Sequence, residues 1–304
     1  MTLLRQITAC SLFLAILQMP LHAADRIAVA GGSITEIIYR LGEEQRIVGV
    51  DSTSTYKNAD KMHPLLGYVR SISVEGVLSL SPDLLIGEND TGPSKALEQV
   101  AAVGLKTAII EEDGTLASIP EKIRHVAKLL KVQDKGEALV NEIQVDIDAL
   151  SFASAKLKKS SIEKPNVLFL LTLKNGTPIA AGSQTSANTT ILEAGGKNAL
   201  ATEKGWIKLS PEAALAFNPD VIVVMNHHDA PYDAIKKLAH FKYTSAVKNK
   251  AVYSIDGGYL LGFGPRTPQA IIELGTMIYS DYPLPNGYQF RYDNNTKNSS
   301  GHGS

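Results

Sequence analysis

The chain has 304 residues, of which 44% are hydrophobic and 20% are charged. This is the composition of a folded globular protein, so it excludes a largely disordered or fibrous chain. Thirty basic residues against 31 acidic ones give a net charge of −1, and a chain without a positive excess is a poor partner for nucleic acid.

The first 23 residues have the pattern of a secretory signal peptide. Arg5 precedes the apolar run ITACSLFLAILQM, and Ala23 is a small residue at a suitable cleavage point. The run is too short to span a membrane comfortably. We therefore expect 1–23 to be removed and the mature protein to be soluble and periplasmic. Cys10, the only cysteine, lies inside this run, which excludes disulfides, zinc–thiolate sites and cysteine catalysis in the mature chain.

The segment that follows predicts a strand, a tight turn and a helix. The strand-like residues 26–30 lead into a double glycine, and Ser33 and Glu36 then have the spacing of a capping box. The helix is expected to end at Gly42, and a second strand is expected at 46–51. The two glycines could also hold an anion on backbone N–H groups, although a tight turn is the simpler interpretation.

One pattern occurs twice in the chain. The segments SVEGVLSLSPDLLI at 73–86 and SPEAALAFNPDVIV at 210–223 share the spacing of a serine, a glutamate and a Pro-Asp pair. Each predicts a short capped helix, a turn and a buried strand. This internal duplication indicates two similar lobes.

The predicted fold is α/β, with two lobes joined by one long helix. Apolar residues recur at helical spacing over 120–160, which indicates a helical connector. Strands that alternate with helices imply a parallel sheet in each lobe, and we expect the ligand cleft between the lobes. The expected boundaries are 24–119 and 161–285 for the lobes, with a disordered polar tail at 286–304.

A histidine pair follows one predicted strand. His227 and His228 come directly after the apolar run 221–225, at the kind of strand end where α/β proteins bind ligands. The pair could ligate a metal, but two ordinary loop histidines are the simpler interpretation. A secreted metal-dependent enzyme would also need carboxylate partners that no spacing in the chain supplies. The chain contains neither G-x-S-x-G nor H-E-x-x-H, and we expect no enzymatic activity.

Tyr68 and Arg70 stand two residues apart in a loop. In an extended chain, side chains at this spacing point the same way. A neighbouring guanidinium and a hard ferric ion both favour the phenolate, and tyrosinate is an axial ligand of ferric haem. Taken alone, a Tyr-x-Arg pattern also fits packing and surface charge, so it does not identify a site.

Several segments together narrow the interpretation. The opening of the chain contains GGSITEIIYRLG and IVGVD, and four further segments are GVDSTSTY (49–56), LGYVRSISVEGVLSLSPDLLIG (66–87), NGTPIAAG (175–182) and LLGFGPRTPQA (260–270). In combination they resemble the periplasmic binding proteins that serve importers of cobalamin, siderophores and haem, and most specifically the haem-binding branch. The resemblance covers nearly all of residues 26–283.

The resemblance implies roles for four residues. It makes Tyr68 the axial ligand of ferric haem b and Arg70 the support of the tyrosine oxygen. It also makes Glu75 and Glu212, the glutamates of the duplicated segments, docking residues for arginines of the membrane permease. Both glutamates would in addition stabilise the positive end of their helix, which is the simpler reason for an acid at that position.

The resemblance is incomplete at the second face of the haem. Some relatives have a histidine just before the Gly-Thr-Pro segment, whereas residues 171–175 here contain none. His227 or His228 could replace it, or the iron could remain five-coordinate. Tyr56 and Tyr259 lie in family-like loops and are candidate contacts for the haem ring, while Arg266 is expected to have a structural role.

The resulting hypothesis is a monomeric periplasmic protein that captures ferric haem and delivers it to an ABC permease, with an outer-membrane haem receptor as an upstream partner. A siderophore- or cobalamin-binding protein of the same class is the nearest alternative. A haem sensor or scavenger is another alternative, and it would not need both docking glutamates.

Overall fold

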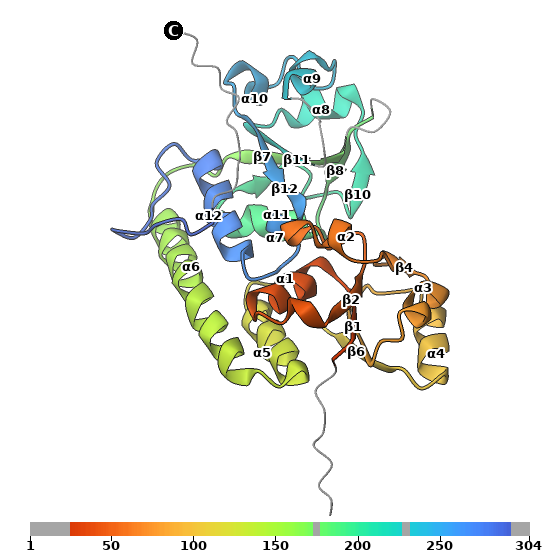
Figure 1. Ribbon diagram of the computed structural model, residues 1–304. Helices are drawn as coiled ribbons and strands as arrows, with labels where there is room; N and C mark the ends of the chain where they lie inside the picture. Colours follow the sequence, from red (N-terminus) through yellow and green to blue (C-terminus); the bar gives the residue numbers. More distant parts are fainter. Residues whose placement is uncertain (1–24, 173–176, 227–231, 293–304) are drawn as a thin grey trace, which may run out of the picture.

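The computed structural model describes residues 25–172, 177–226 and 232–292. These residues form two α/β lobes, with α6 lying along both (Figure 1). The expected fold class is thereby confirmed. Within the described ranges, the structure contains no helix that combines the length and the apolar character needed to cross a membrane.

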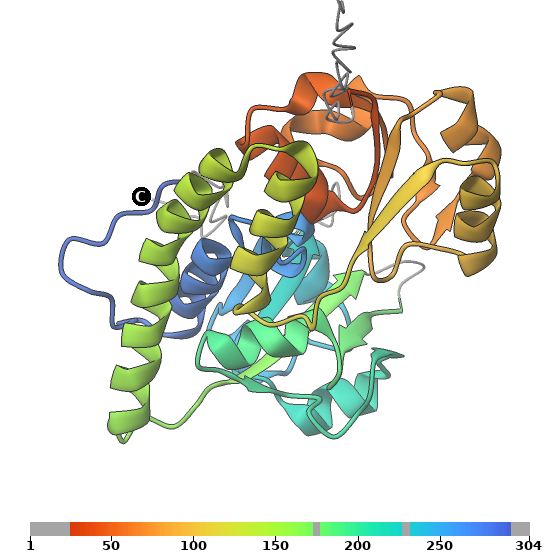
Figure 2. The ribbon, with the colours of Figure 1, turned by 90° about the horizontal axis from the view of Figure 1, so that it is seen from below.

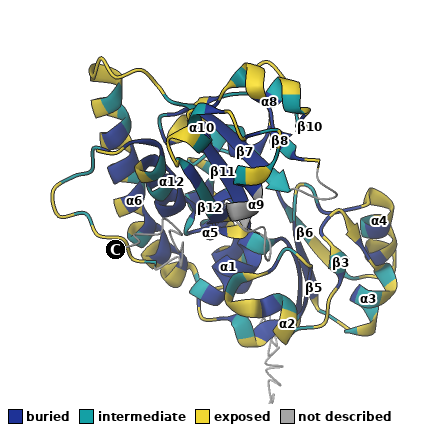
Figure 3. Cartoon of the chain, turned by 90° about the horizontal axis from the view of Figure 1, so that it is seen from above, coloured by how far each residue is buried: buried dark blue, intermediate teal, exposed yellow. Residues whose placement is uncertain are grey.

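The first lobe is built on a four-stranded parallel sheet in the order β2-β1-β5-β6. Its strands are β1 (Ile27–Ala30), β2 (Ile47–Val50), β5 (Leu84–Glu88) and β6 (Lys106–Ile110). All of β1 is buried, because apolar clusters cover both faces of the sheet. The exposed residues lie mainly on the outer faces of the helices (Figure 3).

Helices α1 and α5 pack on one face of this sheet, and α3 and α4 pack on the other. The helices of the lobe are α1 (Gly32–Arg40), α2 (Ala59–Met62), α3 (Val74–Ser79), α4 (Ser94–Ala102) and α5 (Ser118–Leu130), with the short 3-10 turns η1 (Glu44–Arg46) and η2 (Tyr56–Asn58). A small hairpin of β3 (Gly67–Tyr68) and β4 (Ser71–Ile72) completes the lobe.

The second lobe contains a mixed sheet in the order β10-β8-β7-β11-β12, with β9 beside β7. Its strands are β7 (Asn166–Thr172), β8 (Ile179–Ala181), β9 (Lys197–Asn198), β10 (Trp206–Lys208), β11 (Val221–Asn226) and β12 (Val252–Asp256). Strands β7, β11 and β12 are parallel, as expected. Strands β8 and β10 are antiparallel to their neighbours, so one edge of this sheet departs from the all-parallel prediction.

The helices of the second lobe cover both faces of its sheet. They are α7 (Ser186–Glu193), α8 (Pro211–Phe217), α9 (Tyr232–Lys237), α10 (Ser245–Lys248), α11 (Gly257–Leu261) and α12 (Thr267–Ile278).

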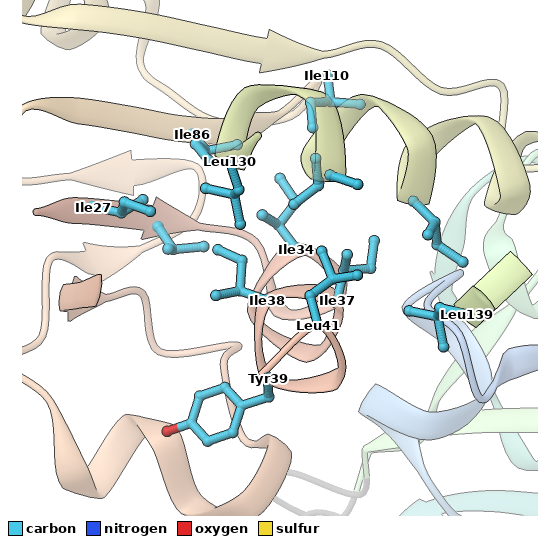
Figure 4. Packing of buried hydrophobic residues seen from close by; sticks show 14 of the residues in the cluster. Ile27, Ile34, Ile37, Ile38, Tyr39, Leu41, Ile86, Ile110, Leu130 and Leu139 are labelled. Carbon is cyan, nitrogen blue, oxygen red and sulfur yellow. The ribbon is translucent and has the colours of Figure 1, made fainter. Parts of the chain in front are cut away.

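The 27-residue helix α6 (Gln133–Lys159) contacts both lobes. Leu139 and Ile143, near its start, belong to the core cluster of the first lobe. Figure 4 shows Leu139 in this cluster, together with Ile37 of α1. Leu150 and Ala153, further along, are buried in the core of the second lobe. Figure 2 shows the helix running past both lobes. The range 120–160, predicted as one helical connector, thus contains two helices, α5 and α6, because the chain breaks at Lys131, whose φ of 60° is left-handed.

The duplicated segments have the same structure in both lobes. Ser73 accepts a hydrogen bond from Gly76 N at 3.0 Å, and Ser210 accepts one from Ala213 N at 3.2 Å, so each serine caps its helix. The aspartate of each Pro-Asp turn then accepts a backbone N–H from the start of the neighbouring strand: Asp83 from Arg26 N, and Asp220 from Asn166 N. The predicted capped helix, turn and strand are therefore present twice.

The end of the described chain is ordered, contrary to the prediction for 286–304. Asp146 of α6 is fully buried, and it binds the guanidinium of Arg291 and accepts a hydrogen bond from the Tyr288 hydroxyl at 2.8 Å. Tyr292 contacts Arg40 of α1. The prediction is wrong for 288–292 because these aromatic and basic side chains find partners on two helices; 293–304 lie outside the described residues.

Replacing Arg291 with alanine should lower the free energy of unfolding by about 3 kcal/mol, because it leaves the carboxylate of Asp146 buried without its cation. Arg124→Ala is the matched control, since Arg124 pairs with Glu121 and Glu137 on the surface, and it should lower that free energy by less than about 1 kcal/mol. Urea denaturation of the three proteins measures both values. Equal losses in the two variants would contradict a structural role for the Arg291 contact.

Candidate functional site

A cavity of about 440 Å³ lies between the two lobes, within the volume range of small-molecule sites. It is bordered by the residues that follow the carboxyl ends of parallel strands in both sheets. Gly32 follows β1, Ser52 follows β2 and Gly257 follows β12. The two sheets therefore direct their ligand-binding edges at the same space.

The two walls of the cavity differ in character. The first lobe contributes mainly hydroxyl and carboxyl groups, whereas the second contributes Leu171, Met225, Leu261 and the glycines of 257–262. A Cβ on Gly257 would lie 2.4 Å from the sulfur of Met225, so a larger residue there would displace the Met225 side chain. The cavity thus offers an apolar surface opposite a polar one.

A buried ion pair closes one side of the cavity. Glu36 of α1 accepts hydrogen bonds from the backbone N–H of Arg266 and from its guanidinium, both at 3.0 Å. The Arg266 guanidinium lies over the ring of Tyr56 at 4.6 Å and over that of Tyr259 at 5.2 Å. Arg266 therefore has the expected structural role, and it also borders the cavity.

The predicted capping box is wrong. Helix α1 begins after Gly31 without a side-chain cap, because Glu36 binds Arg266 and Ser33 binds Glu88. The N–H groups of the double glycine are also engaged: Gly31 donates to Asp51 Oδ1 at 2.9 Å, and Gly32 donates to Thr53 Oγ1 at 3.1 Å. This turn is therefore not an anion site.

Glu88, at the end of β5, lies in the polar wall. Ser33 donates a hydrogen bond to its Oε1, and Ser33 accepts one from the buried Lys122 at 2.9 Å. Lys122 also binds the carboxylate of Glu112. Burial raises the pKa of Glu88 to about 7, against the opposing attraction of Lys122 and the hydrogen bond from Ser33.

Tyr68 borders the cavity at the end of β3 and is 47% exposed. Its hydroxyl has no hydrogen-bond partner in the described part of the chain. The chain reverses at Val69 and Arg70, so the extended geometry assumed for Tyr68 and Arg70 does not hold. Arg70 instead donates to Asp90 Oδ2 at 3.1 Å. That hydrogen bond is the main cause of the raised pKa of Arg70, and the phenol of Tyr68 adds to the effect.

The other candidate tyrosines have different positions. Tyr56 borders the cavity as expected. Tyr259 is fully buried, and its hydroxyl accepts a hydrogen bond from Gln269 Nε2 at 3.0 Å. The prediction that Tyr259 contacts a ligand is therefore wrong in this structure, because its ring packs behind Arg266.

The remaining candidates lie away from the cavity or outside the described residues. His227, His228 and residues 173–175 lie outside the described residues. Glu75 and Glu212 are exposed in the first turn of α3 and of α8, one on each lobe (Figure 1). The N–H of Glu212 and the hydroxyl of Ser210 hold the pKa of Glu212 below its usual value. Among the described residues, no three His, Cys, Asp or Glu side chains gather as a metal site.

Three residues of this region were missed by sequence reasoning. Glu36 and Glu88 find partners 230 and 55 residues away along the chain, and Lys122 binds Ser33 across 89 residues. One signal was present for Glu88, since it is an acid directly after a buried strand of an α/β lobe.

Comparisons with known proteins agree with this geometry. The family model described as periplasmic binding protein matches residues 27–259. The periplasmic haem-binding protein RhuT from Roseiflexus sp. RS-1, in its apo form, is 35% identical, with a TM-score of 0.76 over 84% of this chain and 98% of that one. The periplasmic haem-binding protein BhuT, in complex with two haems, is 33% identical, with a TM-score of 0.75 over 83% and 97%.

A second ligand class occurs among the related sequences. The vitamin B12-binding protein of Vibrio parahaemolyticus is 26% identical over 86% of this chain and 92% of its own length.

Glu88→Gln should change how stability depends on pH. The pKa of Glu88 is about 7 in the folded protein against an ordinary 4.5, so the folded state holds this proton more tightly than the unfolded state. Its contribution to stability is present below pH 4.5 and is lost as pH rises to 7, by at most about 3 kcal/mol. Urea denaturation from pH 4 to pH 8 should show the variant gaining stability relative to the wild type across that interval. A constant difference between the two proteins would contradict the raised pKa.

Proposed function

This chain belongs to the periplasmic binding protein family, and from that premise we propose that it captures ferric haem between its lobes and delivers it to an ABC importer. The observation that carries the proposal is Tyr68, a phenol at the edge of the cavity without a hydrogen-bond partner among the described residues. Ferric iron is a hard ion that binds tyrosinate, and tyrosine is an established axial ligand of haem.

The cavity has the features that a haem requires. Leu171, Met225 and Leu261 provide apolar contact for a porphyrin face. Arg266 borders the same cavity, and its Nε is buried without an acceptor in the described part of the chain. A carboxylate of the ligand would supply the missing acceptor. Tyr56, stacked against that guanidinium, is the proposed contact with the ring.

Arg70 has an indirect role in this proposal. Its guanidinium is held by Asp90 at the mouth of the cavity and interacts electrostatically with Tyr68. A positive charge near the phenol favours the ionised form that binds iron. A sixth ligand would come from His227 or His228, both of which lie outside the described residues; otherwise the iron is five-coordinate.

The similarity to RhuT and BhuT supports haem as the ligand. The similarity to a vitamin B12-binding protein keeps cobalamin as the alternative. Cobalamin already has its own axial ligand, whereas ferric haem accepts a tyrosinate, so an unpartnered phenol in the cavity favours haem. A siderophore fills the coordination sites of its own iron, so it would also leave Tyr68 without a ligand role, and the unpartnered phenol disfavours it for the same reason.

Delivery requires a surface for the permease. Glu75 and Glu212 are exposed at equivalent positions of the duplicated segments, one on each lobe. We propose that both dock on basic residues of an ABC permease, because rim charges of this kind steer and orient a partner. The N-terminal pattern at 1–23 would direct the protein to the periplasm. Binding and delivery require no catalysis, and the proposed protein acts as a monomer.

Tyr68→Phe should remove the tyrosinate–iron charge-transfer absorption of the haem complex and weaken haem binding by about 100-fold or more, since the axial ligand itself is lost. An absorption titration of the purified protein with ferric haem measures both effects, and its end point gives one or two haems. Tyr243→Phe is the matched control, because Tyr243 is exposed outside the cavity. An unchanged spectrum in Tyr68→Phe would move the ligand elsewhere.

Glu75→Lys combined with Glu212→Lys should leave haem affinity unchanged and reduce haem transport by about tenfold or more, because like charges would then face the permease. Transport into proteoliposomes that contain the importer measures this effect. Glu121→Lys is the control, since Glu121 is another exposed acid in the first turn of a helix. Undiminished transport by the double variant would favour a scavenger over a transport protein.

A further inference from the structure

One polar group of the cavity has no part in the proposed function. Glu88 is linked through Ser33 to Lys122, which is 2% exposed and binds Glu112. The hydrogen bond from Ser33 reaches Oε1 of Glu88, and Oε2 has no hydrogen bond in the described ranges. The network therefore begins in the interior of the first lobe and ends at a carboxyl oxygen in the cavity wall.

The backbone is shaped to accommodate this carboxyl group. Gly31 has a φ of +147°, and a Cβ built there would lie 2.6 Å from Cγ and Cδ of Glu88. Any larger residue at position 31 would displace the glutamate. The turn between β1 and α1 thus provides space for Glu88 as well as a change of chain direction.

The charges around Glu88 leave it without a cation of its own. The groups that face it are Ser33 from α1, Lys122 from α5, Glu112 from the loop after β6 and Asp90 from the loop after β5. Each nearby cation already has an acidic partner: the pairs are Lys122–Glu112, Arg70–Asp90 and Arg266–Glu36. An ionised Glu88 would therefore add one uncompensated negative charge to the described wall.

We propose that Glu88 adjusts the charge of the cavity wall to that of the ligand. Glu88 is protonated when a porphyrin that bears carboxylates is enclosed, so capture takes up one proton at this residue. The inference rests on the proposed function, because it requires a porphyrin in the cavity. A carboxylate-bearing ligand excludes water and brings negative charge, and both changes disfavour an ionised Glu88. The protonated carboxyl can also donate a hydrogen bond from Oε2 to an acceptor on the ligand.

The direction of the pH effect follows from the linkage between proton and ligand. In the ligand-free protein the pKa of Glu88 is about 7, and the enclosed ligand raises it further. Below pH 7 the proton is already present, and affinity is constant. Above pH 7 each capture must take up a proton, so affinity falls by up to about tenfold per pH unit until the pKa of the complex is reached.

The probe for the test is metal-free protoporphyrin, because it removes the equilibria of iron and of Tyr68 from the measurement. Its fluorescence reports binding to the wild type, to Glu88→Gln and to the control Glu98→Gln, which changes an exposed acid on α4. Between pH 7.5 and pH 9 ordinary histidines are already neutral. Wild type and control should lose affinity by up to about tenfold per pH unit, whereas Glu88→Gln should bind equally across the range.

A second measurement does not depend on the variant. Calorimetric titration of the wild type with metal-free protoporphyrin at pH 8, in two buffers with different heats of ionisation, gives the number of protons exchanged on binding. Uptake approaching one proton supports the inference, and no uptake overturns it. Equal pH slopes in wild type and Glu88→Gln would also overturn it while leaving haem as the ligand. A failure of the wild type to bind ferric haem itself at any pH would instead overturn the proposed function.

Discussion

The geometry of the cavity depends on the ion pair between Glu36 and Arg266. Both carboxylate oxygens of Glu36 accept a hydrogen bond, one from the guanidinium and one from the backbone N–H of Arg266. The contact therefore fixes the orientation of Arg266 relative to Glu36 as well as the distance between them. Separating the pair would leave a buried charge on each lobe, and breaking such a contact by removing one partner typically costs about 3–5 kcal/mol. The lobes are therefore held together on this side. Helix α6, with residues in both cores, provides the second constraint.

These two constraints explain why the ligand-binding edges of the sheets meet. The strands of each lobe are parallel where they approach the cavity, so their carboxyl ends supply the loops that line it. The duplicated segments then place an exposed glutamate on each lobe, outside the cavity. The proposed capture and docking surfaces are thus separated in space.

Sequence patterns predicted the elements whose determinants are local. The serine caps at 73 and 210 and the strands after the Pro-Asp turns need only near neighbours, and these predictions are confirmed. The patterns failed where residues far apart in the sequence bind a side chain that would otherwise cap its own helix. Ser33 and Glu36 matched a capping box, yet each binds a residue from another element. Likewise, a loop motif could not show that Tyr259 is buried behind Arg266. Nor could the polar composition of the tail show that Arg291 forms an ion pair with the buried Asp146.

A direct comparison of ligands tests the proposal that the cavity binds ferric haem. Equilibrium binding of ferric haem, cyanocobalamin and a ferric siderophore should be measured for the purified protein under one set of conditions. We expect haem to bind saturably with a tyrosinate-type spectrum, and we expect that neither of the other two ligands displaces it. Saturable binding of cobalamin or the siderophore, without saturable binding of haem, would contradict the proposal.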